Sequence, residues 1–192
     1  MTRIMQNIFA LFLALAFGAL PVAGCASHAV PTINPDEQRL YEALLDSWLG
    51  STPSHQLVNL RLEAPPSPAD PDNADCVKGT RSPSPATHPH AERSLSGVRF
   101  QRSGLELVDG KTWIADDPGK SLGRGDIAAA VERGLSHSLI TLSQISFSTD
   151  HKSALVSFSM ACGALCGTGM TVQMRDEGGN WKIVRRCGES IS

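Results

Sequence analysis

Two cysteines near the end of the chain are the residues best suited to chemistry. Cys162 and Cys166 lie in the run Cys-Gly-Ala-Leu-Cys-Gly, where two thiols could form a disulfide, carry out a redox reaction or bind a metal. Their three-residue spacing is not the Cys-x-x-Cys of thioredoxin-like sites, and no βαβ pattern surrounds them. The glycines would let the chain fold back and bring the sulfur atoms within bonding distance. We therefore expect a structural disulfide here.

Other candidates for chemistry have simpler explanations. His88 and His90 could bind a metal, but they lie in a Pro-rich stretch typical of a solvated loop. The run 123–126 could bind an anion at a helix start, yet helix capping explains it equally well. Asp116 and Asp117 precede a Pro-Gly turn, where acids usually face solvent. The sequence also lacks a Gly-x-Ser-x-Gly elbow, so we expect no catalytic residue, metal site or cofactor.

The first 24 residues have the layout of an export signal. A single charge, Arg3, precedes an apolar run over 8–23, and small residues end the segment at Val22-Ala23-Gly24-Cys25. A retained membrane helix is the alternative. Its uninterrupted apolar part, 8–17, is much shorter than the roughly 20 residues that a spanning helix needs.

The end of this segment resembles the lipobox of bacterial lipoproteins: an aliphatic residue, a small residue, Gly or Ala, then Cys, here 22–25. The resemblance implies that cleavage falls before Cys25 and that this thiol carries a diacylglycerol, which holds the protein on a membrane. Ala26 follows, where lipoproteins kept at the inner membrane often carry Asp. The resemblance thus favours the periplasmic side of an outer membrane, in a cell that has one. An ordinary secretory signal with a chance Cys is the alternative.

With Cys25 assigned to the anchor, an even number of cysteines remains. An exported protein meets a compartment in which disulfides persist, so the four remaining thiols predict two disulfides. Counting allows three pairings and does not choose among them. We favour Cys162 with Cys166, and Cys76 with Cys187.

The composition narrows the possible partners. Without the 24 leader residues, the remaining 168 carry 16 Lys and Arg against 19 Asp and Glu, a net charge of −3. A chain of this length suits one domain with its own core, expected over 34–192. Nucleic acid is not an expected partner, because it requires many cationic contacts.

Two helices and several strands would position these residues. After a tether over 25–33, Asn34 can cap a helix that begins at Pro35 and ends at Gly50. Asp126 can cap a second helix. Each helix has one apolar face, which we expect to pack on a sheet: Leu40, Tyr41, Leu44, Leu45 and Trp48 in the first, and Ile127, Ala130, Val131 and Leu135 in the second.

The alternating segments predict the strands. Strands are expected over 56–62, 98–100 and 105–113, the last interrupted by a turn at Asp109-Gly110. An exposed Pro-rich loop is expected over 64–92, with Cys76 stapling it to the domain. The end of the chain predicts an antiparallel four-stranded meander over 139–148, 153–161, 170–175 and 181–187. A turn near Asp150 would place Phe147 opposite Ala154, and Ile145 opposite Val156. Core packing is the expected role of Trp48, Trp113 and Trp181.

The last third of the chain resembles a group of uncharacterised bacterial proteins. The shared features are a Ser-x-Ile-x-Phe strand at 143–147, an Ala-Leu-Val strand at 154–156, the Cys-Gly-x-Leu-Cys-Gly loop and a Gly-x-Trp hairpin at 179–184. The resemblance supports the fold and implies no activity.

These observations predict an α+β domain with an antiparallel sheet meander of about six strands and two helices packed on one face. A small β-rich barrel is the alternative. The expected function is that of a lipid-anchored cell-envelope protein, a non-enzymatic binding or structural module whose partners are the membrane, through Cys25, and another envelope component. The alternative is an envelope enzyme that depends on the thiols of Cys162 and Cys166.

Overall fold

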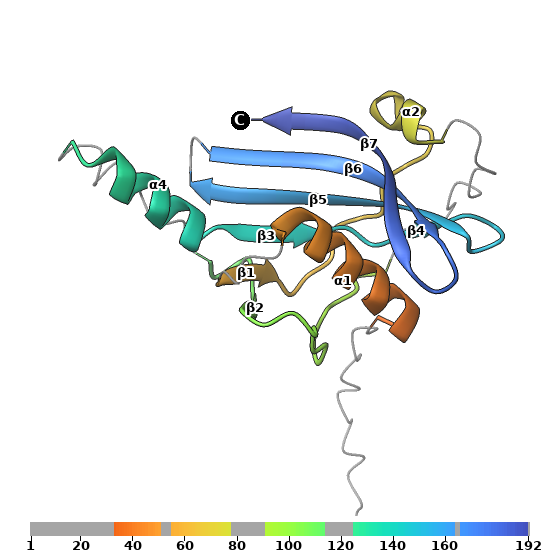
Figure 1. Ribbon diagram of the computed structural model, residues 1–192, viewed down its shortest axis with the longest axis horizontal. Helices are drawn as coiled ribbons and strands as arrows, with labels where there is room; N and C mark the ends of the chain where they lie inside the picture. The colour runs from red at the N-terminus through yellow and green to blue at the C-terminus, as the bar shows by residue number, and fades with distance from the viewer. Residues whose placement is uncertain (1–32, 51–54, 78–90, 114–124, 164–165, 192) are drawn as a thin grey trace, which may run out of the picture.

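The computed structural model describes residues 33–50, 55–77, 91–113, 125–163 and 166–191, and contains a seven-stranded sheet with helices beside it (Figure 1). The strand order is β2-β1-β3-β5-β6-β7, and β4 pairs with β5. This order has two ends, so the described strands form an open sheet and not the alternative barrel. The predicted leader and Cys25, the predicted site of the anchor, lie outside the described residues.

The first helix, α1 (Pro35–Leu49), begins and ends where the sequence predicts. The side chain of Asn34 accepts hydrogen bonds from the backbone N–H groups of Asp36 and Glu37, at 2.9 and 3.0 Å. Glu37 returns the contact by accepting from the Asn34 N–H at 2.8 Å, which completes a capping box. At the other end, Gly50 has φ +65°, a conformation that favours glycine and ends the helix.

The C-terminal half of the sheet is the predicted antiparallel meander, except that the first predicted strand, 139–148, is divided into two. It consists of β3 (Leu139–Leu142), β4 (Ser146–Phe147), β5 (Ser153–Gly163), β6 (Cys166–Asp176) and β7 (Trp181–Ile191). Phe147 pairs with Ala154, as expected from matching apolar residues. Ile145 lies outside the paired residues but packs against the core.

The N-terminal strands correct the prediction of a purely antiparallel sheet. The strand β1 (Gln56–Asn59) runs parallel to both of its neighbours, β2 (Leu105–Val108) and β3, so the sheet is mixed. The alternation of apolar residues identifies a strand but carries no information on its direction. Long connections, 60–104 and 109–138, separate these strands along the chain, and only such crossovers can return a strand in parallel.

A turn follows β2 at the predicted Asp109-Gly110, but the predicted strand over 105–113 ends at Val108 and does not resume within 109–113. The N–H of Gly110 donates to Oδ1 of Asn59, at the end of β1, at 3.1 Å. A Cβ atom at position 110 would lie 2.6 Å from Nδ2 of Asn59, so a glycine permits this close approach. The predicted strand over 98–100 is absent, and this described segment is irregular.

The main core lies between α1 and one face of the sheet. Helix residues Leu40, Tyr41, Leu44 and Leu45 are almost wholly buried against alternate strand residues, which are Val58, Ile140, Leu142, Ala154, Val156, Phe158, Met170, Val172 and Met174. The Trp48 ring meets Phe158 edge-on, with 4.5 Å between ring centroids. The period of two along β5 and β6 therefore assigns the even-numbered residues to the α1 face.

The second predicted helix forms as α4 (Ile127–Ser136), but its packing differs from the expectation. Its contact with β5 is at Gly134, which approaches Cys162. Ile127 and Val131 are 66% and 56% exposed, so the first half of the apolar face does not pack on the sheet. An amphipathic pattern indicates which face of a helix is apolar, while the tertiary structure decides whether a sheet lies under it.

A short irregular segment crosses the other face of the sheet. Within the predicted Pro-rich loop lie η1 (Pro71–Asn73) and α2 (Ala74–Val77), capped by the Asp70 side chain, which accepts from the Asp72 N–H at 3.0 Å. We call these seven residues, 71–77, the η1–α2 strap. It contacts β6 and β7, and it is continuous with the rest of the loop.

Candidate functional site

One of the two predicted disulfides joins α2 to β7. Cys76 in α2 is bonded to Cys187 in β7 across a sequence separation of 111 residues, with 6.0 Å between their Cα atoms. Both are buried, and with Leu155 and the half-buried Val77 they form a small apolar cluster separate from the main core. This confirms the predicted pair. The disulfide holds the η1–α2 strap on the face of the sheet opposite α1.

The Cys162 side of the second predicted pair lies at the end of β5. Cys162 is 2% exposed and disulfide-bonded, while the side chain of its predicted partner Cys166 lies outside the described residues. The backbones of Gly163 and Cys166 pair across the β5–β6 hairpin. The chain thus folds back at this motif, as its glycines predicted.

A buried ion pair links α1 to the segment after the Pro-rich stretch. Arg93 donates through both terminal nitrogens to the carboxylate of Glu37, with 2.6 Å between Nη2 and Oε2. The Glu37 side chain is 5% exposed and that of Arg93 is 22% exposed. A two-pronged pair of this kind is stronger and more directional than a single ion contact.

Burial and pairing act in opposite directions on the pKa of Glu37. Desolvation of the carboxylate raises its pKa, but the hydrogen bonds from Arg93 and from the Asn34 backbone, together with the Arg93 charge, more than offset this effect. The pKa of Glu37 therefore lies below its ordinary value. The hydrogen bond to Glu37 raises the pKa of Arg93, so both groups stay charged and engaged with each other.

Tyr41, one helical turn after Glu37, completes this network. Its ring is wholly buried, and its hydroxyl donates to the carbonyl oxygen of Ser143 at 2.7 Å. Burial, and secondly the negative charge of Glu37, raises the pKa of Tyr41 far above its ordinary value. The sequence indicated Tyr41 only as a core residue and Glu37 only as a charge at the helix start. Nothing in the sequence indicated Arg93 as the partner of Glu37, because these two residues are 56 positions apart.

A shallow hollow of about 220 Å³ lies near the β5–β6 hairpin. Its lining comes from the three last strands and consists mostly of small residues: Ser159, Met160, Ala161, Gly167, Thr168, Gly169 and Ser190. Hydroxyl and backbone groups there can form hydrogen bonds, but none of these residues titrates near neutral pH. The hollow suits contact with another surface better than acid–base chemistry.

The remaining sequence candidates have structural roles or lie outside the described residues. Asp126 caps α4, since its carboxylate accepts from the Ala129 N–H at 3.0 Å. The histidines at 88 and 90, the acids at 116–117 and the run 123–124 lie outside the described residues. Trp181 is buried beside Phe147, and Trp113 donates to the carbonyl oxygen of His137 at 3.1 Å. Among the described residues, no three His, Cys, Asp or Glu side chains lie close enough together to hold a metal ion.

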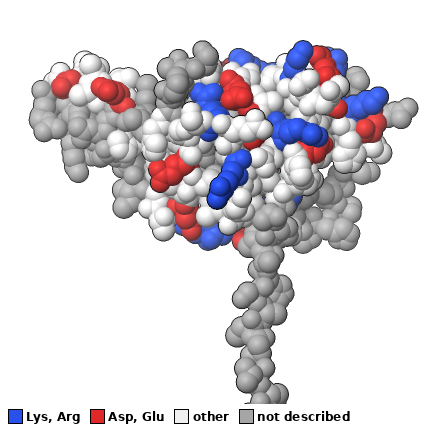
Figure 2. Space-filling view, turned by 60° about the horizontal axis from the view of Figure 1, so that its bottom comes forward, with Lys and Arg blue, Asp and Glu red and all other residues white. Residues whose placement is uncertain are grey.

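The charged surface is mixed in sign. Figure 2 shows Lys and Arg interspersed with Asp and Glu over the face in view, without a continuous basic area. Exposed pairs such as Lys182 with Glu177, at 2.7 Å, account for part of this pattern. None of the helices in the described ranges combines the length and apolar character needed to cross a bilayer.

The chain matches no protein-family model, no curated protein and no solved structure. Function must therefore be argued from the residues and contacts of this chain alone.

Proposed function

We propose that the protein is a lipid-anchored module of the cell envelope, held on a membrane through Cys25, that works by binding another envelope component. The observation that carries this proposal is the Cys76–Cys187 disulfide. Such bonds form and persist in oxidising compartments outside the cytoplasm, which is where the leader would send the chain. The leader and the disulfide are independent features, and both favour export.

A binding role is favoured by how the buried polar groups are used. The buried charges of Glu37 and Arg93 are paired with each other, and the Tyr41 hydroxyl is engaged by a backbone carbonyl. Groups held in this way stabilise the fold and are not available to a substrate. The hollow near the β5–β6 hairpin is lined without a general acid or base.

Lipid labelling tests the anchor. Cells that express the full chain are given a radioactive or clickable fatty acid, and the protein is then recovered from the membrane fraction. The wild-type protein should carry label, whereas Cys25→Ser should carry none and keep its leader. Ser27→Ala, two residues away, is the matched control and should be labelled normally. Label on the Cys25→Ser protein would contradict the proposed anchor.

Thiol labelling separates the binding module from a thiol-dependent enzyme. Native protein treated with a maleimide should remain unmodified, and denatured, reduced protein should take up label at Cys76, Cys162, Cys166 and Cys187. Rapid labelling of native Cys162 or Cys166 would instead support the enzyme. Modification of native Cys76 or Cys187 would show that their disulfide is not formed, which would contradict the observation that carries the proposal.

A further inference from the structure

Among the described strands, β7 stands at the end of the order and pairs with β6 alone. It is 11 residues long, and its C-terminal residues are exposed, with Ile191 82% accessible. An unpaired edge of this length is a template for another strand, so proteins normally cover it or interrupt it.

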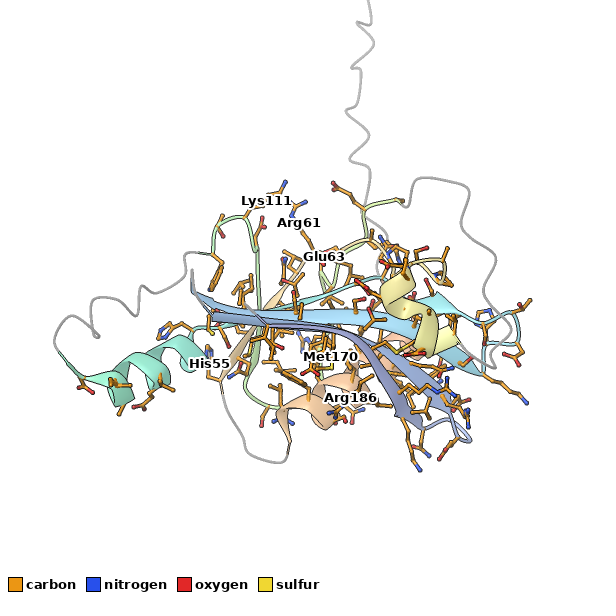
Figure 3. The ribbon with its side chains drawn as sticks, turned by 90° about the horizontal axis from the view of Figure 1, so that it is seen from above. His55, Arg61, Glu63, Lys111, Met170 and Arg186 are labelled. Carbon is orange, nitrogen blue, oxygen red and sulfur yellow. A yellow bond between two sulfur atoms is a disulfide. The ribbon has the colours of Figure 1, made fainter. Side chains whose placement is uncertain are left out.

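The η1–α2 strap lies against the middle of this edge, where Cys187 is buried. Figure 1 shows α2 beyond β7, and Figure 3, which looks at the molecule from that side, shows α2 in front of the sheet. The contacts agree with this placement: Arg185 donates to the Asp75 carbonyl oxygen at 2.7 Å, and a Cβ at Gly188 would lie 3.5 Å from the Asp72 carbonyl oxygen.

The disulfide is the strongest link between the strap and the edge. Besides the Cys76–Cys187 bond, the contacts of α2 with the sheet include the small cluster around Leu155, the Arg185 hydrogen bond and a long contact of the Cys76 sulfur with the Thr171 carbonyl oxygen. A four-residue helix has little stability of its own. The disulfide is the covalent link that holds this short helix over β7, so its reduction should loosen the strap.

The edge beneath the strap is complementary to itself. If two copies of β7 pair antiparallel with Cys187 opposite Gly188, then Arg186 of each copy lies opposite Glu189 of the other. In the same register Val184 meets Ile191, both of them exposed apolar residues, and Arg185 meets Ser190. Opposite charges and apolar residues facing each other are the pairs that stabilise antiparallel strands.

Of the two β-bulges in β7, the one at residues 188–189 makes this register geometrically consistent. Residues paired across strands must point to the same face of a sheet, and a regular strand would put positions 186 and 189 on opposite faces. In β7, however, Arg186 is opposite Val172, and two residues, 188 and 189, correspond to Met170 alone. Val172 and Met170 share the α1 face, and Figure 3 shows Met170 and Arg186 on one side of the sheet. The extra residue therefore brings Glu189 to the face of Arg186.

From these observations we propose that the Cys76–Cys187 disulfide locks a cover over a self-complementary strand edge. The dithiol form of the protein pairs with a second copy through β7, and the disulfide form stays monomeric. This inference does not depend on the lipid anchor or on the proposed binding role. The dithiol form arises before the bond is made, or when an external dithiol gives two electrons and two protons to the disulfide and becomes a cyclic disulfide itself.

Sedimentation of the full processed chain in detergent tests the lock. The oxidised wild-type protein should be monomeric, and Cys76→Ala/Cys187→Ala should form a concentration-dependent dimer. The matched control is Cys162→Ala/Cys166→Ala, which removes the other predicted disulfide and should stay monomeric. If the first variant loses its near-UV circular dichroism, wild-type protein reduced with dithiothreitol, which keeps both side chains, is measured in its place. A folded protein without the Cys76–Cys187 bond that remains monomeric would overturn the proposal.

Charge exchange tests the register. In the Cys76→Ala/Cys187→Ala background, Arg186→Glu should weaken the homodimer roughly tenfold, because it places like charges opposite each other twice. Glu189→Arg should do the same. A mixture of the two variants should form a heterodimer, since every Glu then faces an Arg. Lys111→Glu, in the turn after β2, is the control and should have no effect. The β7 register would be refuted if the charges at positions 186 and 189 did not change the affinity of the dimer, or if the two variants did not associate when mixed.

Discussion

The buried pair of Glu37 and Arg93 predicts a large and pH-dependent effect of one substitution. In Glu37→Gln the amide oxygen can still accept from the Asn34 N–H, so the capping box persists while the negative charge is lost. Arg93 then remains next to a neutral group. Removing one partner of a buried ion pair costs about 3–5 kcal/mol, but Arg93 is 22% exposed and can turn partly to water. We therefore expect a loss of about 2–3 kcal/mol in the free energy of unfolding at neutral pH.

Urea denaturation followed by circular dichroism measures this loss, with Arg93→Met and the double variant completing a thermodynamic cycle. The matched control is the exposed pair Glu177 and Lys182, whose cycle should show no coupling beyond experimental error. If the coupling energy of Glu37 with Arg93 is no larger than that of Glu177 with Lys182, the reasoning is refuted, because the low exposure of Glu37 then adds nothing to its interaction with Arg93.

The pH dependence follows from the lowered pKa of Glu37. A carboxyl group with a lowered pKa in the folded state contributes its full stabilisation above its ordinary value of 4.5 and loses it as the pH falls through the folded-state value. Protonated Glu37 resembles Gln, so the stability difference between the wild-type protein and Glu37→Gln should be constant near neutrality and shrink below pH 4.5. A difference that stays constant into strong acid would contradict the assignment.

Three further predictions concern stability. The Cys76→Ala/Cys187→Ala variant should lose up to about 4–5 kcal/mol of the free energy of unfolding measured in urea, because the bond closes a loop with a separation of 111 residues. A loss under about 1 kcal/mol would show that the disulfide restrains the unfolded chain very little. Tyr41 is the sole tyrosine, so the change in absorbance near 295 nm on tyrosine ionisation reports this residue alone. Because its pKa is raised in the folded state, the protonated hydroxyl contributes its full stabilisation below pH 10, and this contribution is lost as the pH rises above 10. Tyrosinate absorbance should therefore appear together with alkaline unfolding, and a reversible titration near pH 10 in folded protein would contradict the burial. Finally, Asn34→Ala should lower the free energy of unfolding by about 1 kcal/mol, with Ser47→Ala, at an exposed position of the same helix, as the control, and equal effects would argue against the cap.

The local elements of the fold could be predicted because the signals for them are short-range. The Asn34 cap, the Gly50 helix end, the Asp109-Gly110 turn and the meander each depend on residues within one turn or one hairpin. The pairing of Phe147 with Ala154 follows from matching two neighbouring apolar patterns across a tight turn. Such features need no knowledge of how the rest of the chain is arranged.

The mixed direction of the sheet and the exposed face of α4 could not be predicted in this way. Apolar alternation is the same in parallel and antiparallel strands, and the direction of β1 depends on long connections whose path no local pattern describes. The apolar residues Ile127 and Val131 predict an amphipathic helix, but α4 extends past the ends of the strands (Figure 1), and these side chains stay exposed. A sequence pattern cannot show where a sheet ends.

The sequence by itself determined the candidate cysteines and the likeness of the leader to a lipoprotein signal, since both depend on residue type and spacing along the chain. It also favoured the Cys76–Cys187 pair among three possibilities. Only the tertiary structure brought those two cysteines together over β7, paired Glu37 with Arg93, and showed that a bulge places Arg186 and Glu189 on one face. The reason is physical: contacts between residues 56 or 111 positions apart are set by how the whole chain closes around its core.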